Sequence, residues 1–306
     1  MINIYEAQAA NKRKSFIVII LFVIFVTFSV YILSQATGIY FGYEPGGLGV
    51  VGIAFIVSGL MSLGSYYFSD KIILGISGAR QADRKKDFIF YSVCENLCIA
   101  AQIPKPKLYI IEDSAPNAFA SGRDPEHAVI CATSGLLEKL NRSEIEGVIA
   151  HEISHIRNYD TRLMAIVAVL VGMVALLADI FLRISFRGRG NRRSEGGAIF
   201  LLIGIVFAIL SPIVAQLIQL AVSRRREFYA DSSSVGLTRQ PQGLITALTK
   251  ISGDSEALEA ANKATAHLYI VNPFKEKGHG QVGWFSSLFN THPPVIERIE
   301  ALKQMS

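Results

Sequence analysis

The chain has 306 residues, of which 51% are hydrophobic, and its mean hydropathy of +0.37 exceeds that of ordinary soluble domains. The formal net charge of +5 does not require a nucleic-acid partner, because the cytoplasmic loops of membrane proteins collect lysine and arginine. Three cysteines are too few for a disulfide framework, and Cys94 and Cys98 are expected to pack in the core rather than bind a metal.

The N-terminal quarter of the chain has the pattern of two membrane spans. Residues 1–14 are polar and end in three consecutive basic residues, whereas residues 15–34 and 46–68 carry no charge. About 20 apolar residues at a rise of 1.5 Å each cross the hydrocarbon core of a bilayer. Basic residues also follow the second stretch. The sequence therefore predicts two transmembrane helices within residues 15–68, with residues 1–14 in the cytoplasm.

A soluble character begins near residue 84 and continues to residue 162. Helical periodicity over residues 87–101 ends at a proline-containing segment. Three short strands are expected at residues 107–112, 117–121 and 127–131. A further helix is expected to begin near residues 141–143, with Ser143 and Glu146 as its capping box.

That further helix contains the pattern His151-Glu152-Ile153-Ser154-His155. On a helix, positions four apart lie on one face, so both imidazoles can bind one zinc ion with Zn–N bonds of about 2.0–2.1 Å. Glu152 can then act as general base on the attacking water. The alternative is a surface helix with two ordinary histidines. The apolar neighbours favour the metal, because a buried carboxylate needs a partner.

Two more apolar stretches follow, Leu163 to Leu182 and residues 198–222, joined by an arginine-rich linker over residues 185–197. If both stretches cross the bilayer, the linker lies outside, against the positive-inside tendency. A membrane-embedded hairpin removes this conflict. The sequence leaves both arrangements open.

A third metal ligand is predicted at Glu227. Gln216, Gln219, Ser223, Glu227 and Asp231 recur at helical spacing and form a polar stripe on an apolar helix. The alternative is that the Glu227 carboxylate only pairs with its basic neighbours. If it shares a metal with the two histidines, all three ligands lie on one side of the bilayer. The metal should then lie within about 10 Å of the membrane surface.

Four segments, in this order, resemble the HtpX heat-shock membrane metalloproteases, part of the zinc endopeptidase group that includes the CAAX prenyl proteases. The segments are Asn117–Arg123, His151–His155, Glu227–Asp231 and Thr291–Pro294. The similarity extends over nearly the whole chain. It implies a mostly α, α+β fold in which multi-pass membrane helices join a cytosolic zincin-type (gluzincin) domain with a small β-sheet. Residues 84–162 and 223–306 would form the two halves of that domain.

The resemblance also implies a role for each site residue. His151, His155 and Glu227 would bind one zinc ion per chain, with Glu152 as the base. Asp231 would orient a zinc-binding histidine; its alternative is a solvated carboxylate at a helix end.

Two further roles follow from the same resemblance. His292 would help to stabilise the oxyanion, although it is also a plausible turn residue before Pro293. The strand that would bind an extended substrate by β-augmentation comprises Asn117, Ala118, Phe119, Ala120 and Ser121. A purely structural strand is the alternative. No chemical role follows for His267 or Asn272.

The function implied is that of a zinc-dependent integral-membrane endopeptidase in a bacterial cell membrane. Its active site would face the cytoplasm and hydrolyse unfolded or misfolded membrane proteins, with the lipid bilayer as its other partner and no nucleic acid. One alternative is a site-specific processing protease of the CAAX prenyl-protease type. Another is a membrane scaffold or chaperone in which the zinc is structural. The sequence does not define the oligomeric state.

Overall fold

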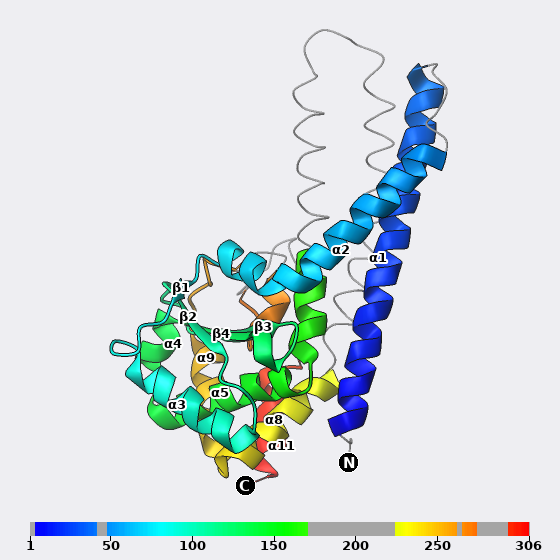
Figure 1. Cartoon of the computed structure of the whole chain (residues 1–306). Helices are drawn as coiled ribbons and strands as arrows, with labels where there is room; N and C mark the ends of the chain where they lie inside the picture. Colours follow the sequence, from blue (N-terminus) through cyan, green and yellow to red (C-terminus); the bar gives the residue numbers. More distant parts are fainter. Residues whose placement is uncertain (1–3, 42–47, 171–223, 262–264, 274–292, 306) are drawn as a thin grey trace.

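The computed structural model describes residues 4–41, 48–170, 224–261, 265–273 and 293–305. Two long helices, α1 (Ile4–Phe41) and α2 (Leu48–Ile76), pack against each other and extend away from a domain that contains the sheet and the remaining described helices (Figure 1). These helices cover most of residues 15–68, in which the sequence predicted two transmembrane helices.

Among the described residues, no single helix is both long and apolar enough for a membrane crossing. Two consecutive helical segments, Val51–Gly64 and Tyr66–Ile76, are together long and apolar enough for one crossing, but the helix bends by 67° between them. The two crossings in residues 15–68 therefore stay a prediction. Of the third apolar stretch only residues 163–170 are described, and they are helical and buried; the linker and the fourth stretch lie outside the described residues.

The domain contains one small mixed sheet. Its strands are β1 (Arg80–Gln81), β2 (Lys107–Ile111), β3 (Ala118–Gly122) and β4 (Ala128–Thr133). They follow the order β1-β2-β4-β3, with β2 and β4 parallel and the other two pairs antiparallel. The three predicted strands are confirmed to within two residues. Strand β1 has only two residues, both exposed, and so has no hydrophobic pattern to predict it.

The sheet separates two apolar cores, because alternate residues of a strand point to opposite faces. Ile110 and Ile130 belong to the core that contains α3 (Phe88–Ala101), whereas Ile111 and Cys131 belong to the core that contains part of α1. Cys94 and Cys98 are buried in the first core as free cysteines, which confirms their predicted packing role.

Helix α5 (Arg142–Arg157) lies at the centre of the domain and carries both histidines of the motif. It contacts α3, α8, α9 and β3, and twelve of its sixteen residues are buried. A helix over residues 160–170, described only in this part, follows α5. The other described helices of the domain are α4 (Ser134–Lys139), α8 (Arg224–Thr238), α9 (Gln242–Gly253), α11 (Val295–Lys303) and the 3-10 turns η1 (Pro125–His127) and η2 (Ala266–Leu268).

The capping box of α5 differs from the prediction. Asn141 is the N-cap, and its side chain accepts from the Glu144 N–H (3.0 Å), while the Glu144 carboxylate accepts from the Asn141 N–H (2.8 Å). Ser143 lies inside the helix, and Glu146 pairs with Arg142 one turn earlier. The predicted box was two residues late because asparagine caps a helix as well as serine does.

We expect Gly147→Ala to destabilise the domain. A Cβ at this position of α5 would lie 2.6 Å from the backbone nitrogen of Leu244 in α9, too close for any side-chain atom. Overpacking of this kind costs about 1–3 kcal/mol, so the midpoint of thermal unfolding in detergent should fall.

Gly236→Ala is the matched control, because nothing lies within 4 Å of a Cβ at this exposed position of α8. Alanine should stabilise the helix there by up to about 1 kcal/mol. Equal unfolding midpoints for the two variants would contradict the close packing of α5 on α9.

Candidate metal centre

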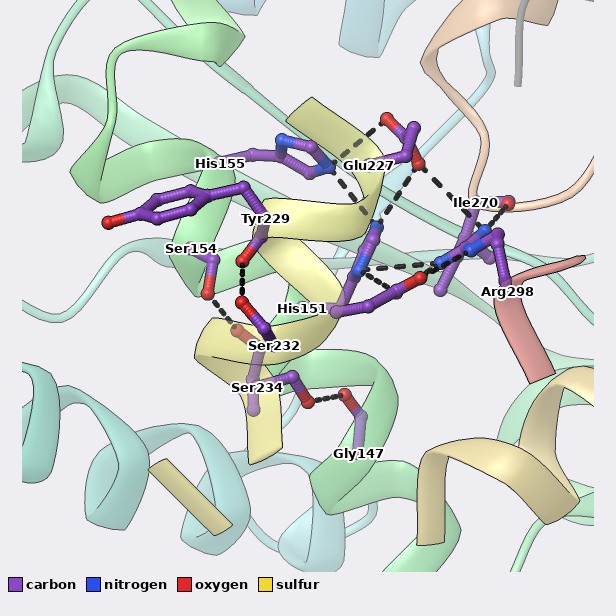
Figure 2. Close-up of polar contacts among 12 residues, drawn as sticks. Gly147, His151, Ser154, His155, Glu227, Tyr229, Ser232, Ser234, Ile270 and Arg298 are labelled. Carbon is purple, nitrogen blue, oxygen red and sulfur yellow. Dashed lines mark hydrogen bonds and ion pairs between the residues drawn. The ribbon is translucent and has the colours of Figure 1, made fainter. Parts of the chain in front are cut away.

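Helices α5 and α8 bring three side chains to one point, as Figure 2 shows for His151, His155 and Glu227. The two histidine Nε2 atoms lie 3.1 Å apart. The Glu227 carboxylate oxygens lie 3.6 Å from Nε2 of His151 and 3.5 Å from Nε2 of His155. All three residues are at most 4% exposed. The structure thus brings together the predicted ligand set.

The spacing of these atoms fits a tetrahedral metal ion. Zinc bonds of about 2.0–2.1 Å place neighbouring ligand atoms about 3.3–3.4 Å apart. The three separations of 3.1, 3.5 and 3.6 Å lie close to that value. Two imidazoles and one carboxylate are also the donor set of many catalytic zinc sites, which keep a fourth position open.

Each histidine has a carboxylate behind it. Nδ1 of His151 lies 2.9 Å from Asp231, and Nδ1 of His155 lies 3.1 Å from Asp160. A carboxylate accepts hydrogen bonds, so each Nδ1 carries a proton and each Nε2 is the nitrogen that can bind a metal. Asp231 is the acid that the resemblance indicated. Asp160 was missed, because only a turn after α5 brings it back to the imidazole.

Arg298 of α11 is a second residue that the sequence did not reveal. Its guanidinium is fully buried and donates to both carboxylate oxygens of Asp231, at 2.8 and 2.7 Å, and to the Ile270 carbonyl at 3.0 Å. It also lies 3.8 Å from the Glu227 carboxylate. Arginine in a short, charged C-terminal helix reads as a solvent-facing residue, so no local pattern predicts this burial.

The buried charges shift one another's pKa values. Burial and the Arg298 charge lower the pKa of His151, but hydrogen bonds to Asp231 and Glu227 outweigh them and raise it to about 9. Burial raises the pKa of Asp231, but Arg298 and His151 together lower it to about 2. Asp231 is therefore ionised at neutral pH and remains an acceptor for the histidine.

Glu152 lies between the ligands and the sheet. It is 2% exposed, and burial raises the pKa of its carboxyl group, partly opposed by the two histidines. The backbone of Ala120 in β3 lies close enough to this carboxylate to oppose part of that rise in its pKa. The predicted general base therefore contacts the predicted substrate strand.

The predicted substrate strand forms the edge of the sheet, and all of its residues are buried. The Asn117 side chain donates to the Val271 carbonyl, and the Ala118 carbonyl accepts from the Ile270 N–H. The beginning of this edge is therefore paired with the chain's own segment at residues 265–273.

The sequence also raised two other histidines, His267 and His292. His292 lies outside the described residues. His267 is fully buried in η2, and its Nε2 lies 3.2 Å from the Met164 carbonyl, so it joins two buried segments rather than the metal centre.

The chain is similar to several known proteins. The model of peptidase family M48 matches residues 89–306. A protein named "Protease HtpX homolog" from Thermoanaerobacter pseudethanolicus is 41% identical, covering 99% of this chain and 98% of its own length. Another of that name, from Dictyoglomus turgidum, is 44% identical and covers 98% and 94%. The crystal structure of S. mikatae Ste24p is similar at a TM-score of 0.46 and 19% identity, covering 90% of this chain and 62% of that one.

We expect Asp231→Asn to weaken zinc binding by about 10–100-fold, the usual effect of losing a carboxylate behind a histidine ligand. The amide can still accept one hydrogen bond, but it leaves the buried guanidinium of Arg298 without its anion. Competition with a chromophoric chelator measures the affinity. Asp254→Asn, which removes the carboxylate paired with Lys139 at the surface, is the control and should bind zinc like the wild type.

Proposed function

Because the chain belongs to peptidase family M48, we propose that it is a zinc-dependent endopeptidase of a bacterial cell membrane that cleaves misfolded membrane proteins from the cytoplasmic side. That it is a metalloprotease follows from the family and from its HtpX relatives. The single observation that carries the proposed zinc chemistry is the convergence of His151, His155 and Glu227 beside the buried carboxylate of Glu152.

The chemistry divides between the metal and the chain. Zinc held by the two histidines and Glu227 would supply a Lewis acid that makes an attacking water more acidic. Glu152 takes the proton from that water and later gives it to the leaving amine. Burial raises the pKa of this carboxyl group, which makes the carboxylate a stronger base toward the attacking water.

An extended substrate would add to the outer edge of β3. In an antiparallel strand, alternate residues direct their backbone groups outward, and Ala118, Ala120 and Gly122 share that side. The Ala118 carbonyl is already paired with Ile270, so the substrate would pair from Ala120 onward, beside Glu152. A peptide can enter this edge only where it is locally unfolded, which favours misfolded proteins as substrates.

The membrane location rests on the two long helices. Large apolar side chains are exposed along both of them, far more than a water-facing helix pair carries. They include Phe16, Leu21, Ile24, Ile53, Phe55, Ile56 and Leu60. Basic residues at positions 12–14 and again after α2 favour the cytoplasm as the side that holds the metal centre.

We expect Glu152→Gln to retain one zinc per chain but to lose proteolysis by about 10²–10⁴-fold, because glutamine cannot take up the proton. Zinc content and casein-type cleavage by the full chain in detergent are the measurements. Glu146→Gln, a half-buried carboxylate on the same helix, should change neither value. Wild-type cleavage by the Glu152 variant would rule out this base.

The same assay separates the two alternatives. A wild-type protein that binds one zinc tightly but cleaves no unfolded substrate would be a scaffold with a structural metal. Cleavage of membrane substrates at one defined site only would favour a processing protease of the CAAX type.

A further inference from the structure

One face of α1 is buried against the domain. Asn11, Ser15, Val18 and Phe22 recur at helical spacing and are each at most 4% exposed, whereas their neighbours Lys12 and Arg13 are exposed. Val18 and Phe22 pack in the same core as residues 163–168 of the helix that follows α5. This buried face is therefore polar at Asn11 and Ser15 and apolar at Val18 and Phe22.

The Asn11 side chain forms two hydrogen bonds, and both acceptors belong to residues at least 147 positions later in the sequence. Its Nδ2 donates to Asp160 Oδ1 at 2.7 Å and to the Asn158 carbonyl at 2.9 Å. Both partners are acceptors, so the amide nitrogen must face them, and both of its hydrogens are used.

These two bonds hold the turn that ends the metal-binding helix. The C-cap of α5 is Asn158, and Tyr159 takes a left-handed backbone conformation with φ of 58°. This turn reverses the chain, so that the Asp160 side chain lies against the last turn of α5. The Lys12 ammonium lies 4.2 Å from the centre of the Tyr159 ring, so α1 contacts the turn at two points.

The second oxygen of Asp160 is the one that meets the metal ligand. Asp160 Oδ2 lies 3.1 Å from Nδ1 of His155, while Oδ1 accepts from Asn11. The Asn11 amide, the nearer of two donors to Oδ1, thus helps to fix the rotation of the carboxylate that orients the imidazole; the other is Arg226, whose Nη1 lies 3.6 Å from the same oxygen. Asp231 has the same relation to His151, except that Arg298 holds it.

We propose that Asn11 is a positioning residue of the metal centre, which it reaches through Asp160 and His155. This inference rests on the metal centre proposed above. The first helix would then complete the active site as well as anchor the chain. The competing interpretation is that Asn11 only docks α1 on the domain, in which case losing its amide would not alter the affinity for metal.

The test uses the full chain in detergent, with zinc affinity measured by chelator competition and folding by thermal unfolding. Asn11→Leu keeps the size of the side chain and removes both donors. We expect it to weaken zinc binding by about 10-fold, the lower end of the range for partners of metal ligands. Ser15→Ala is the matched control, because this buried hydroxyl on the same face donates only within α1, to the Asn11 carbonyl, and should leave the affinity unchanged.

A double-mutant cycle separates positioning from docking. If Asn11 acts through Asp160, adding Asn11→Leu to Asp160→Asn should weaken zinc binding little beyond the second change alone. Effects that multiply in the double variant would overturn the proposal, as would an Asn11→Leu affinity equal to that of Ser15→Ala.

Asn11→Ser decides the question if the leucine variant does not unfold cooperatively. Its hydroxyl offers one donor in place of two, so a folded protein with weakened zinc binding supports the proposal, and wild-type affinity contradicts it. A wild-type chain that binds no zinc would instead refute the metal centre itself. The two failures are therefore distinguishable.

Discussion

The structure depends on keeping a dense group of charges buried at the junction of α5 and α8. Four carboxylates and one guanidinium lie there almost without exposure to water, belonging to Glu152, Asp160, Glu227, Asp231 and Arg298. Buried charges are costly unless they are paired. Arg226 adds a second guanidinium 3.6 Å from Asp160, but two guanidinium groups do not balance four carboxylates. A divalent cation between the two histidines would offset much of the remaining negative charge. The folded centre is therefore suited to a metal by its charge as well as by its geometry.

Much of this centre could be predicted from the sequence, because local spacing determines it. The four-residue separation of His151 and His155 needs only a helix to bring the imidazoles together, and the polar stripe predicted Glu227. The partners behind the histidines follow from no such spacing. Asp160 depends on a left-handed turn at Tyr159, and Arg298 depends on how α11 packs, so neither has a local signal.

The same contrast holds for the fold. The strands with apolar residues were predicted to within two residues, whereas the exposed pair Arg80–Gln81 was not. Helix α5 was expected, but its start was displaced because two overlapping caps, at Asn141 and Ser143, fit the same stretch of sequence. The hydrophobic pattern was thus sufficient to predict α5 and the three longer strands. The start of α5 and the presence of β1 depend on contacts that the pattern does not contain.

The two ends of the chain converge on the two histidines. A donor from α11 holds the carboxylate behind His151, and a donor from α1 holds the carboxylate behind His155. A carboxylate that lost this donor would be held less firmly against the imidazole, so the orientation of each ligand depends in part on a helix far away in sequence. A fragment that begins after α2 would contain the whole motif and all three proposed ligands, yet it would lack the amide that orients one of them. For this reason the N-terminal helix and the peptidase domain are best regarded as one functional unit.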